Sequence, residues 1–284
     1  MEAGFLVSVI IVLTAFVLIA GTIFRFMSSA EDKQAETLCK DSIALRAATS
    51  LNVKETEFRV SPVLCKTLDK KISGSKEEVE SQIAQKMARC WEIFGEGSYK
   101  TGAFDNTNLF AGGNKCFMCY TIAIDESSDF KRDSQGISGQ EFQQYLRETT
   151  YDKKKQTYLD YFQFGGGPGY VVGLLSEEGI KPGRGYGIAF KAKAQDSEGG
   201  GDLLLGGGLS AGIGAIGFYT IGIGGSLLGG GAALAGIGAY SLISDLITDT
   251  KSNVDAIMLV DLSNEEISRA MNEKCEFVSD IGGK

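Results

Sequence analysis

The stretch LLLGGGLSAGIGAIGFYTIGIGGSLLGGGAALAGIGAYSLIS, residues 203–244, decides the predicted fold. It is rich in glycine and has no charged residue between Asp202 and Asp245. One helical crossing of a ~30 Å hydrocarbon core takes roughly 20 residues, so this run suits two crossings joined by a turn. The sequence therefore predicts a transmembrane helical hairpin over residues 201–249.

The two halves of this run are similar in sequence. AGIGA occurs at 211–215 and again at 235–239, and the segment between them, 222–226, has the composition of a tight turn. Small residues recur four positions apart, a spacing that lets helix backbones approach closely in lipid. A helical hairpin buried inside a soluble protein is the alternative that composition leaves open. The predicted helix-packing residues are Gly206, Gly208, Ser210, Gly212, Gly214, Gly225, Gly229, Gly236 and Gly238.

A second apolar run, AGFLVSVIIVLTAFVLIAGTIF, occupies residues 3–24 and has no charge. Its length predicts a transmembrane anchor over residues 1–27. The alternative is a cleaved signal peptide with residues 28–30 as its small-residue site, but the apolar core is too long and no basic residue precedes it. Basic residues after the span favour a cytoplasmic location for that end, whereas the cysteines favour the opposite side.

The remaining sequence, residues 28–200 and 250–284, predicts an extracytoplasmic α+β domain that the glycine-rich hairpin interrupts. Because the two ends of a hairpin meet, the strand before the insert and the strand after it are predicted to be neighbours in one sheet. The patterning predicts helices from Ser29, Ser75, Ser138 and Ser263, and strands over 57–64, 115–124, 170–175, 185–193 and 254–262.

The clearest of these helices begins at Ser75, which can form a capping box with Glu78. Apolar residues then recur at spacings of three or four, as expected of a helix with one buried face. Residues 95–97, Gly-Glu-Gly, are predicted to end the helix. The apolar positions are Val79, Ile83, Met87, Trp91 and Phe94.

Composition excludes several classes of function. The net charge is −8 with no basic stripe, which argues against a nucleic-acid partner. The chain has no histidine, the usual general base and the commonest metal ligand, which argues against triad hydrolases and catalytic zinc sites. No catalytic residue, metal ligand or cofactor is therefore predicted, and the protein is expected not to be an enzyme.

The cysteines predict disulfides and a compartment. An even number spread through the domain favours three disulfides, of which a Cys65–Cys90 pair is predicted. Disulfides imply an oxidising, extracytoplasmic space. The alternatives are a zinc site or a redox pair that uses the C-x-x-C of Cys116 and Cys119, although the strand-like sequence there lacks the helix N-terminus that lowers a thiol pKa. The six candidates are Cys39, Cys65, Cys90, Cys116, Cys119 and Cys275.

Short sequence patterns give two resemblances to other proteins. CWEIFGEG at 90–97, CFMC at 116–119 and the late Cys275 resemble uncharacterised membrane-anchored archaeal proteins with an extracytoplasmic domain. That resemblance covers roughly residues 5–130 and the C-terminal tail and implies no activity. Gly4 before Phe5 is similar to an archaeal pilin-type leader, but Val9 stands where such leaders have glutamate.

Together these observations predict a non-enzymatic, membrane-anchored surface protein whose glycine-rich hairpin packs helices and drives oligomer assembly. The expected partners are the lipid bilayer and further copies of the chain or other membrane proteins. One alternative is a membrane-active or channel-forming protein, although few polar residues are available to line a pore. The second alternative is a thiol-disulfide or metal-binding protein that uses Cys116 and Cys119.

Overall fold

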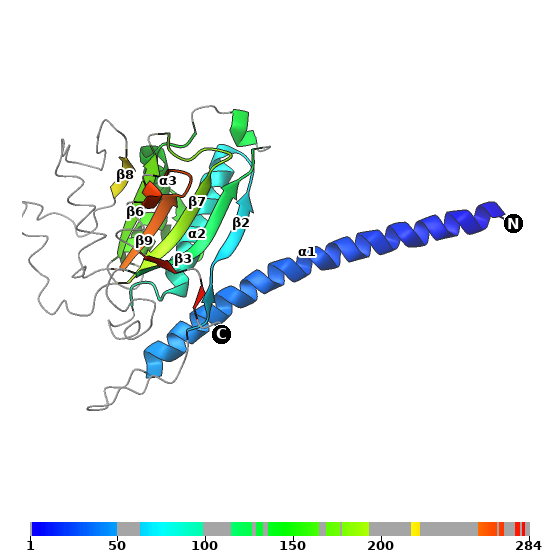
Figure 1. Ribbon diagram of the computed structural model, residues 1–284, viewed down its shortest axis with the longest axis horizontal. Helices are drawn as coiled ribbons and strands as arrows, with labels where there is room; N and C mark the ends of the chain where they lie inside the picture. Colours follow the sequence, from blue (N-terminus) through cyan, green and yellow to red (C-terminus); the bar gives the residue numbers. More distant parts are fainter. Residues whose placement is uncertain are drawn as a thin grey trace, which may run out of the picture.

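The structure is a computed structural model that describes residues 2–49, 63–98, 115–126, 129–132, 136–164, 169–176, 178–192, 217–221, 255–265, 267–269, 276–278 and 280–281. A mixed, seven-stranded β-sheet forms the centre of the described domain. Helices cover one face of the sheet, and the long N-terminal helix leaves the domain (Figure 1).

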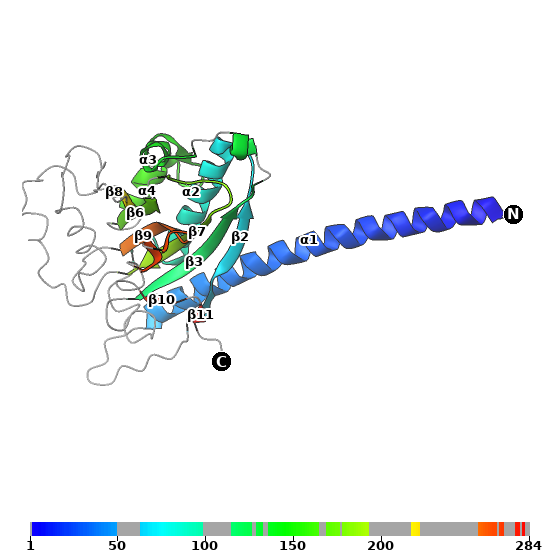
Figure 2. The same cartoon turned by 45° about the horizontal axis from the view of Figure 1, so that its top comes forward.

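The helices are α1 (Glu2–Thr49), α2 (Lys76–Ile93), α3 (Gly139–Glu148), α4 (Tyr158–Phe164) and the 3-10 helix η2 (Asp129–Arg132). The strands are β1 (Cys65–Lys66), β2 (Leu68–Ile72), β3 (Lys115–Ile124), β4 (Thr150–Tyr151), β5 (Gln156–Thr157), β6 (Gly169–Ser176), β7 (Gly185–Lys191), β8 (Gly217–Ile221), β9 (Asp255–Asp261), β10 (Glu276–Val278) and β11 (Asp280–Ile281). Figure 2 shows α2, α3 and α4 grouped together over the sheet.

The strand order of the main sheet is β10-β3-β7-β9-β6-β8, with β2 also paired to β3. Strand β7 runs antiparallel to both neighbours, whereas β2, β10, β6 and β8 pair in parallel. The pairing of β7 with β9 confirms that the strand before the glycine-rich stretch lies beside the strand after it. Every residue of β9 is buried, so this strand is covered on both faces.

The predicted transmembrane helical hairpin over 201–249 is not supported. Gly217–Ile221, which falls in its first predicted helix, forms strand β8 and pairs with β6. The residues 218–221 are Phe-Tyr-Thr-Ile, and aromatic and β-branched side chains favour a strand. A continuous apolar run does not by its hydropathy distinguish a buried strand from a helix. The other residues of the predicted hairpin lie outside the described residues.

Within the described part of the chain, no helix is both long and apolar enough to cross a membrane. The predicted transmembrane anchor over 1–27 is therefore corrected to the first part of α1. The helix predicted to begin at Ser29 is continuous with it, because residues 25–32 contain neither glycine nor proline to break the helix. The architecture is a mixed α/β sheet domain with a long N-terminal helix, not the predicted α+β domain with a membrane insert.

Helix α2 forms the centre of the main core, as its sequence predicts. The Ser75 hydroxyl accepts a hydrogen bond from the Glu78 N–H, and the Glu78 carboxylate accepts one from the Ser75 N–H, which completes the capping box. All five predicted apolar positions are buried. The Phe94 ring stacks on Phe190 of β7 with centroids 4.4 Å apart, which joins the end of α2 to the sheet. The helix predicted from Ser138 and the strand over 115–124 are also confirmed as α3 and β3.

Candidate functional site

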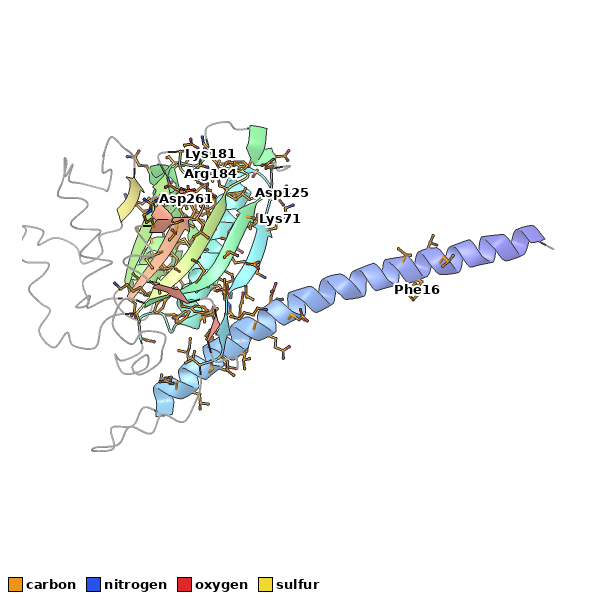
Figure 3. The ribbon with its side chains drawn as sticks, in the orientation of Figure 1. Phe16, Lys71, Asp125, Lys181, Arg184 and Asp261 are labelled. Carbon is orange, nitrogen blue, oxygen red and sulfur yellow. A yellow bond between two sulfur atoms is a disulfide. The ribbon has the colours of Figure 1, made fainter. Side chains whose placement is uncertain are left out.

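Helix α1 has two parts with different surroundings, residues 2–30 (the projecting half) and residues 31–49 (the docked half). The projecting half extends away from the domain (Figure 1). Four of its large apolar side chains are mostly exposed: Ile11 (60%), Leu13 (58%), Phe16 (68%) and Val17 (66%). Figure 3 shows the labelled Phe16 far from the sheet. These side chains form an apolar surface that no described element covers.

A disulfide and hydrogen bonds fasten the docked half to the domain. Cys39 of α1 is bonded to Cys65 of β1, and both are buried. The Ser42 hydroxyl accepts a hydrogen bond from the Leu64 N–H at 3.0 Å. Ile43 is fully buried in the main core. The docked half is therefore part of the domain, whereas the projecting half is not.

A charged network crosses from α1 to α2 and β3. The Glu36 carboxylate accepts hydrogen bonds from Arg89 Nε at 2.8 Å and from the Tyr120 hydroxyl at 2.7 Å. Arg89 also contacts Glu92, which accepts a hydrogen bond from Lys40 at 2.9 Å. Burial alone would raise the pKa of Glu92, but the hydrogen bonds from Lys40 and Arg89 lower it to about 2. Glu92 is therefore ionised at neutral pH and holds α1 through Lys40.

The second disulfide joins Cys90 of α2 to Cys119 of β3. The prediction that these cysteines are oxidised is confirmed for both described pairs. The specific Cys65–Cys90 pairing is wrong, because Cys65 faces α1 and Cys90 faces the sheet. Cys116 is also disulfide-bonded.

The C-x-x-C motif does not form a redox pair or a metal site in this structure. Cys116 and Cys119 lie on strand β3, are both buried, and are not bonded to each other, since Cys119 is bonded to Cys90. A zinc site or a thiol nucleophile needs a thiolate, which a disulfide sulfur does not provide. In the described residues, no group of three or more histidine, cysteine, aspartate or glutamate side chains could hold a metal ion.

An open groove lies between α1, α2 and the hairpin of β4 and β5 (the α1–α2 groove). Its volume is about 620 Å³, and Tyr151 and Tyr158 form part of its lining. A second cavity, of about 10 Å³, lies beside Cys39 and Cys119 and has room for little more than a water molecule. The charged residues that line the α1–α2 groove are Lys33, Glu36, Lys86, Arg89, Asp152 and Lys153.

The sequence did not indicate the groove, because its residues come from three separate segments. Lys33 and Glu36 lie one helical turn apart on α1, and Lys86 and Arg89 have the same spacing on α2. Such spacings are common on solvated helix faces and carry no signal of a shared site. A lysine run such as 153–155 is typical of a solvated face, yet Lys153 lines the groove.

Other predicted site residues lie beyond what the structure describes. These are Cys275 and the helix-packing residues Gly206, Gly208, Ser210, Gly212, Gly214, Gly225, Gly229, Gly236 and Gly238. The comparisons with protein-family models, with curated proteins and with solved structures returned no match.

Proposed function

We propose that this protein is a non-enzymatic structural subunit that assembles with other copies of itself through the projecting half of α1. The observation that carries the proposal is the exposure of four large apolar side chains on a helix that leaves the domain. An isolated helix in water is marginally stable, because most helical stability in proteins comes from packing. A partner that covers this half would therefore stabilise both the helix and the assembly.

The positions of these side chains favour several neighbours rather than one. At 3.6 residues per turn, Leu13, Phe16 and Val17 share one stripe of the helix, and Ile11 lies on the opposite side. A helix that is apolar on all sides is buried on all sides. Burying each of the four exposed side chains against a neighbour would stabilise the assembly by roughly 1–2 kcal/mol. A bundle of α1 helices from several copies provides such cover.

We further propose that the domain lies in an oxidising, extracytoplasmic space. The Cys39–Cys65 and Cys90–Cys119 disulfides support this, because structural disulfides are rare in the cytosol. A membrane-impermeant thiol reagent applied to intact cells should label these cysteines only after external reduction. Labelling of free thiols only after cell lysis would contradict this location.

Sedimentation velocity of the full-length, oxidised protein in mild detergent tests the assembly. The wild-type protein should sediment as an oligomer, and a Phe16→Glu, Val17→Glu double variant should sediment as a monomer, because burying two carboxylates in a helix bundle is costly. Leu45→Glu is the matched control. Leu45 is 54% exposed on the docked half, so this variant should remain oligomeric.

Flotation with phosphatidylcholine vesicles tests whether the projecting half is covered by lipid or by other copies of the chain. Monomeric wild-type protein that floats with the vesicles, and a double variant that does not, would show that lipid covers the projecting half. That result would contradict self-assembly through α1. Oligomers that form equally in the wild-type protein and the double variant would also contradict it, because assembly would then use another surface.

A further inference from the structure

The α1–α2 groove carries more positive than negative charge, although the whole chain has a net charge of −8. Its lining includes four cations and two carboxylates. One of these carboxylates, Glu36, is already bonded to Arg89 and Tyr120. The excess of positive charge in an acidic protein indicates a local preference for anions.

Two of the lysines have no carboxylate partner. Among the described residues, neither Lys33 nor Lys86 has a carboxylate within ion-pair distance. Lys86 is held over the ring of Tyr120, with Nζ 5.1 Å from the ring centroid. Burial lowers the pKa of Lys86, although Glu36 raises it. A partly buried ammonium group without an ion pair would be stabilised by a bound anion.

Lys153 approaches the groove from the hairpin of β4 and β5. Its Nζ lies 3.6 Å from Glu92, beyond ordinary hydrogen-bond distance, so its protons remain available to another acceptor. Burial raises the pKa of Tyr151 to about 12 and also raises the pKa of Tyr158, so both phenols stay neutral and add no negative charge. The lysines therefore approach one space from three different elements.

We propose that the α1–α2 groove binds a small, multiply charged anion through Lys33, Lys86 and Lys153. The volume of about 620 Å³ falls in the range of small-molecule sites. The Cys39–Cys65 disulfide and the Glu36–Arg89 ion pair fix α1 against the domain, so two walls of the groove are in place before binding. Phosphate and carboxylate groups both provide the oxygen acceptors that ammonium groups bind.

Isothermal titration calorimetry of the full-length, oxidised protein tests the site, with pyrophosphate and citrate as separate probes and acetate as the singly charged control. We expect saturable binding of about one probe molecule per chain, weaker at higher salt because ions screen the charges. Binding of pyrophosphate alone would identify a phosphate ligand, binding of citrate alone a polycarboxylate. Either result supports the proposal.

Lysine variants test whether the anion binds in the α1–α2 groove. Lys86→Met keeps the apolar stem and should weaken binding by about tenfold or more, and Lys33→Met by about threefold or more. Lys181→Met is the matched control and should bind like the wild-type protein. Lys181 is not part of the groove lining; it pairs with Glu178 and lies near Arg184, away from α1 (Figure 3).

Three results would overturn the proposal. The first is that neither multivalent probe gives saturable heat up to about 1 mM. The second is that Lys181→Met weakens probe binding as much as Lys86→Met does. The third is that both groove variants bind the probe as tightly as the wild-type protein does. Near-UV circular dichroism of each variant checks the fold. Lys33 is exposed on α1, so Lys33→Met keeps the test decisive if Lys86→Met disturbs packing.

Discussion

Glu80 of α2 is a buried carboxyl group, and one of its oxygens has no hydrogen-bond partner in the described structure. The residue is 6% exposed, and the oxygen without a partner is Oε1. Burial, followed by the Glu141 carboxylate, raises the pKa of Glu80 to about 7, although Lys76 lowers it. The folded chain therefore holds this proton more tightly than the unfolded chain does. As a result, the stability contributed by protonated Glu80 is lost as the pH rises from 4.5 through 7.

We expect Glu80→Gln to raise the free energy of unfolding by roughly 1–3 kcal/mol at pH 8. Near pH 4.5 the gain should largely disappear, because folded wild-type Glu80 then carries its proton. Urea denaturation at the two pH values measures both effects. Glu265→Gln, which removes an exposed carboxylate, is the control and should change stability by less than about 0.5 kcal/mol. Equal stabilisation by Glu80→Gln at both pH values would contradict the assigned cause.

Single elements could be predicted where their signals are local. The capping residues Ser75 and Ser138 correctly located α2 and α3, and the β-branched and aromatic run at 115–124 located β3. Strand β8 was predicted as helix because its segment is apolar and glycine-rich, and hydropathy does not distinguish the two. The aromatic segment 158–164 forms α4, which packs against β6, and it is too short for its periodicity to distinguish a helix from a strand.

We expect the capping box to contribute to the stability of α2. Ser75→Ala removes the acceptor for the Glu78 N–H and should lower the free energy of unfolding by about 1 kcal/mol. Ser81→Ala is the control within the same helix: it removes the exposed hydrogen bond from Gln85, but alanine is the better helix former, so little net change is expected. Urea denaturation of both variants at pH 7 measures the difference. Equal destabilisation by the two variants would show that the cap does not set the stability of α2.

Across the whole molecule, the contacts that shape the candidate site join distant parts of the chain. The Cys39–Cys65 and Cys90–Cys119 disulfides span 26 and 29 residues, and Glu36 is separated from Arg89 by 53. Local patterns predicted that the cysteines are oxidised, but pairing depends on how α1 and α2 pack on the sheet. The docking of α1 and the α1–α2 groove depend on the same packing. Local sequence patterns therefore predict the elements, but not the site that lies between them.

The Cys39–Cys65 disulfide should control how firmly α1 is held, rather than whether the sheet folds. Replacing both cysteines by serine removes a cross-link and should lower the free energy of unfolding by about 3 kcal/mol. Hydrogen exchange should then accelerate most in the docked half of α1, which keeps its core contacts, the Ser42–Leu64 hydrogen bond and several ion pairs to the domain. The Cys90→Ser, Cys119→Ser variant is the matched comparison, and its exchange should accelerate in α2 and β3. Uniform acceleration throughout the domain in both variants would show that neither disulfide holds one element in particular.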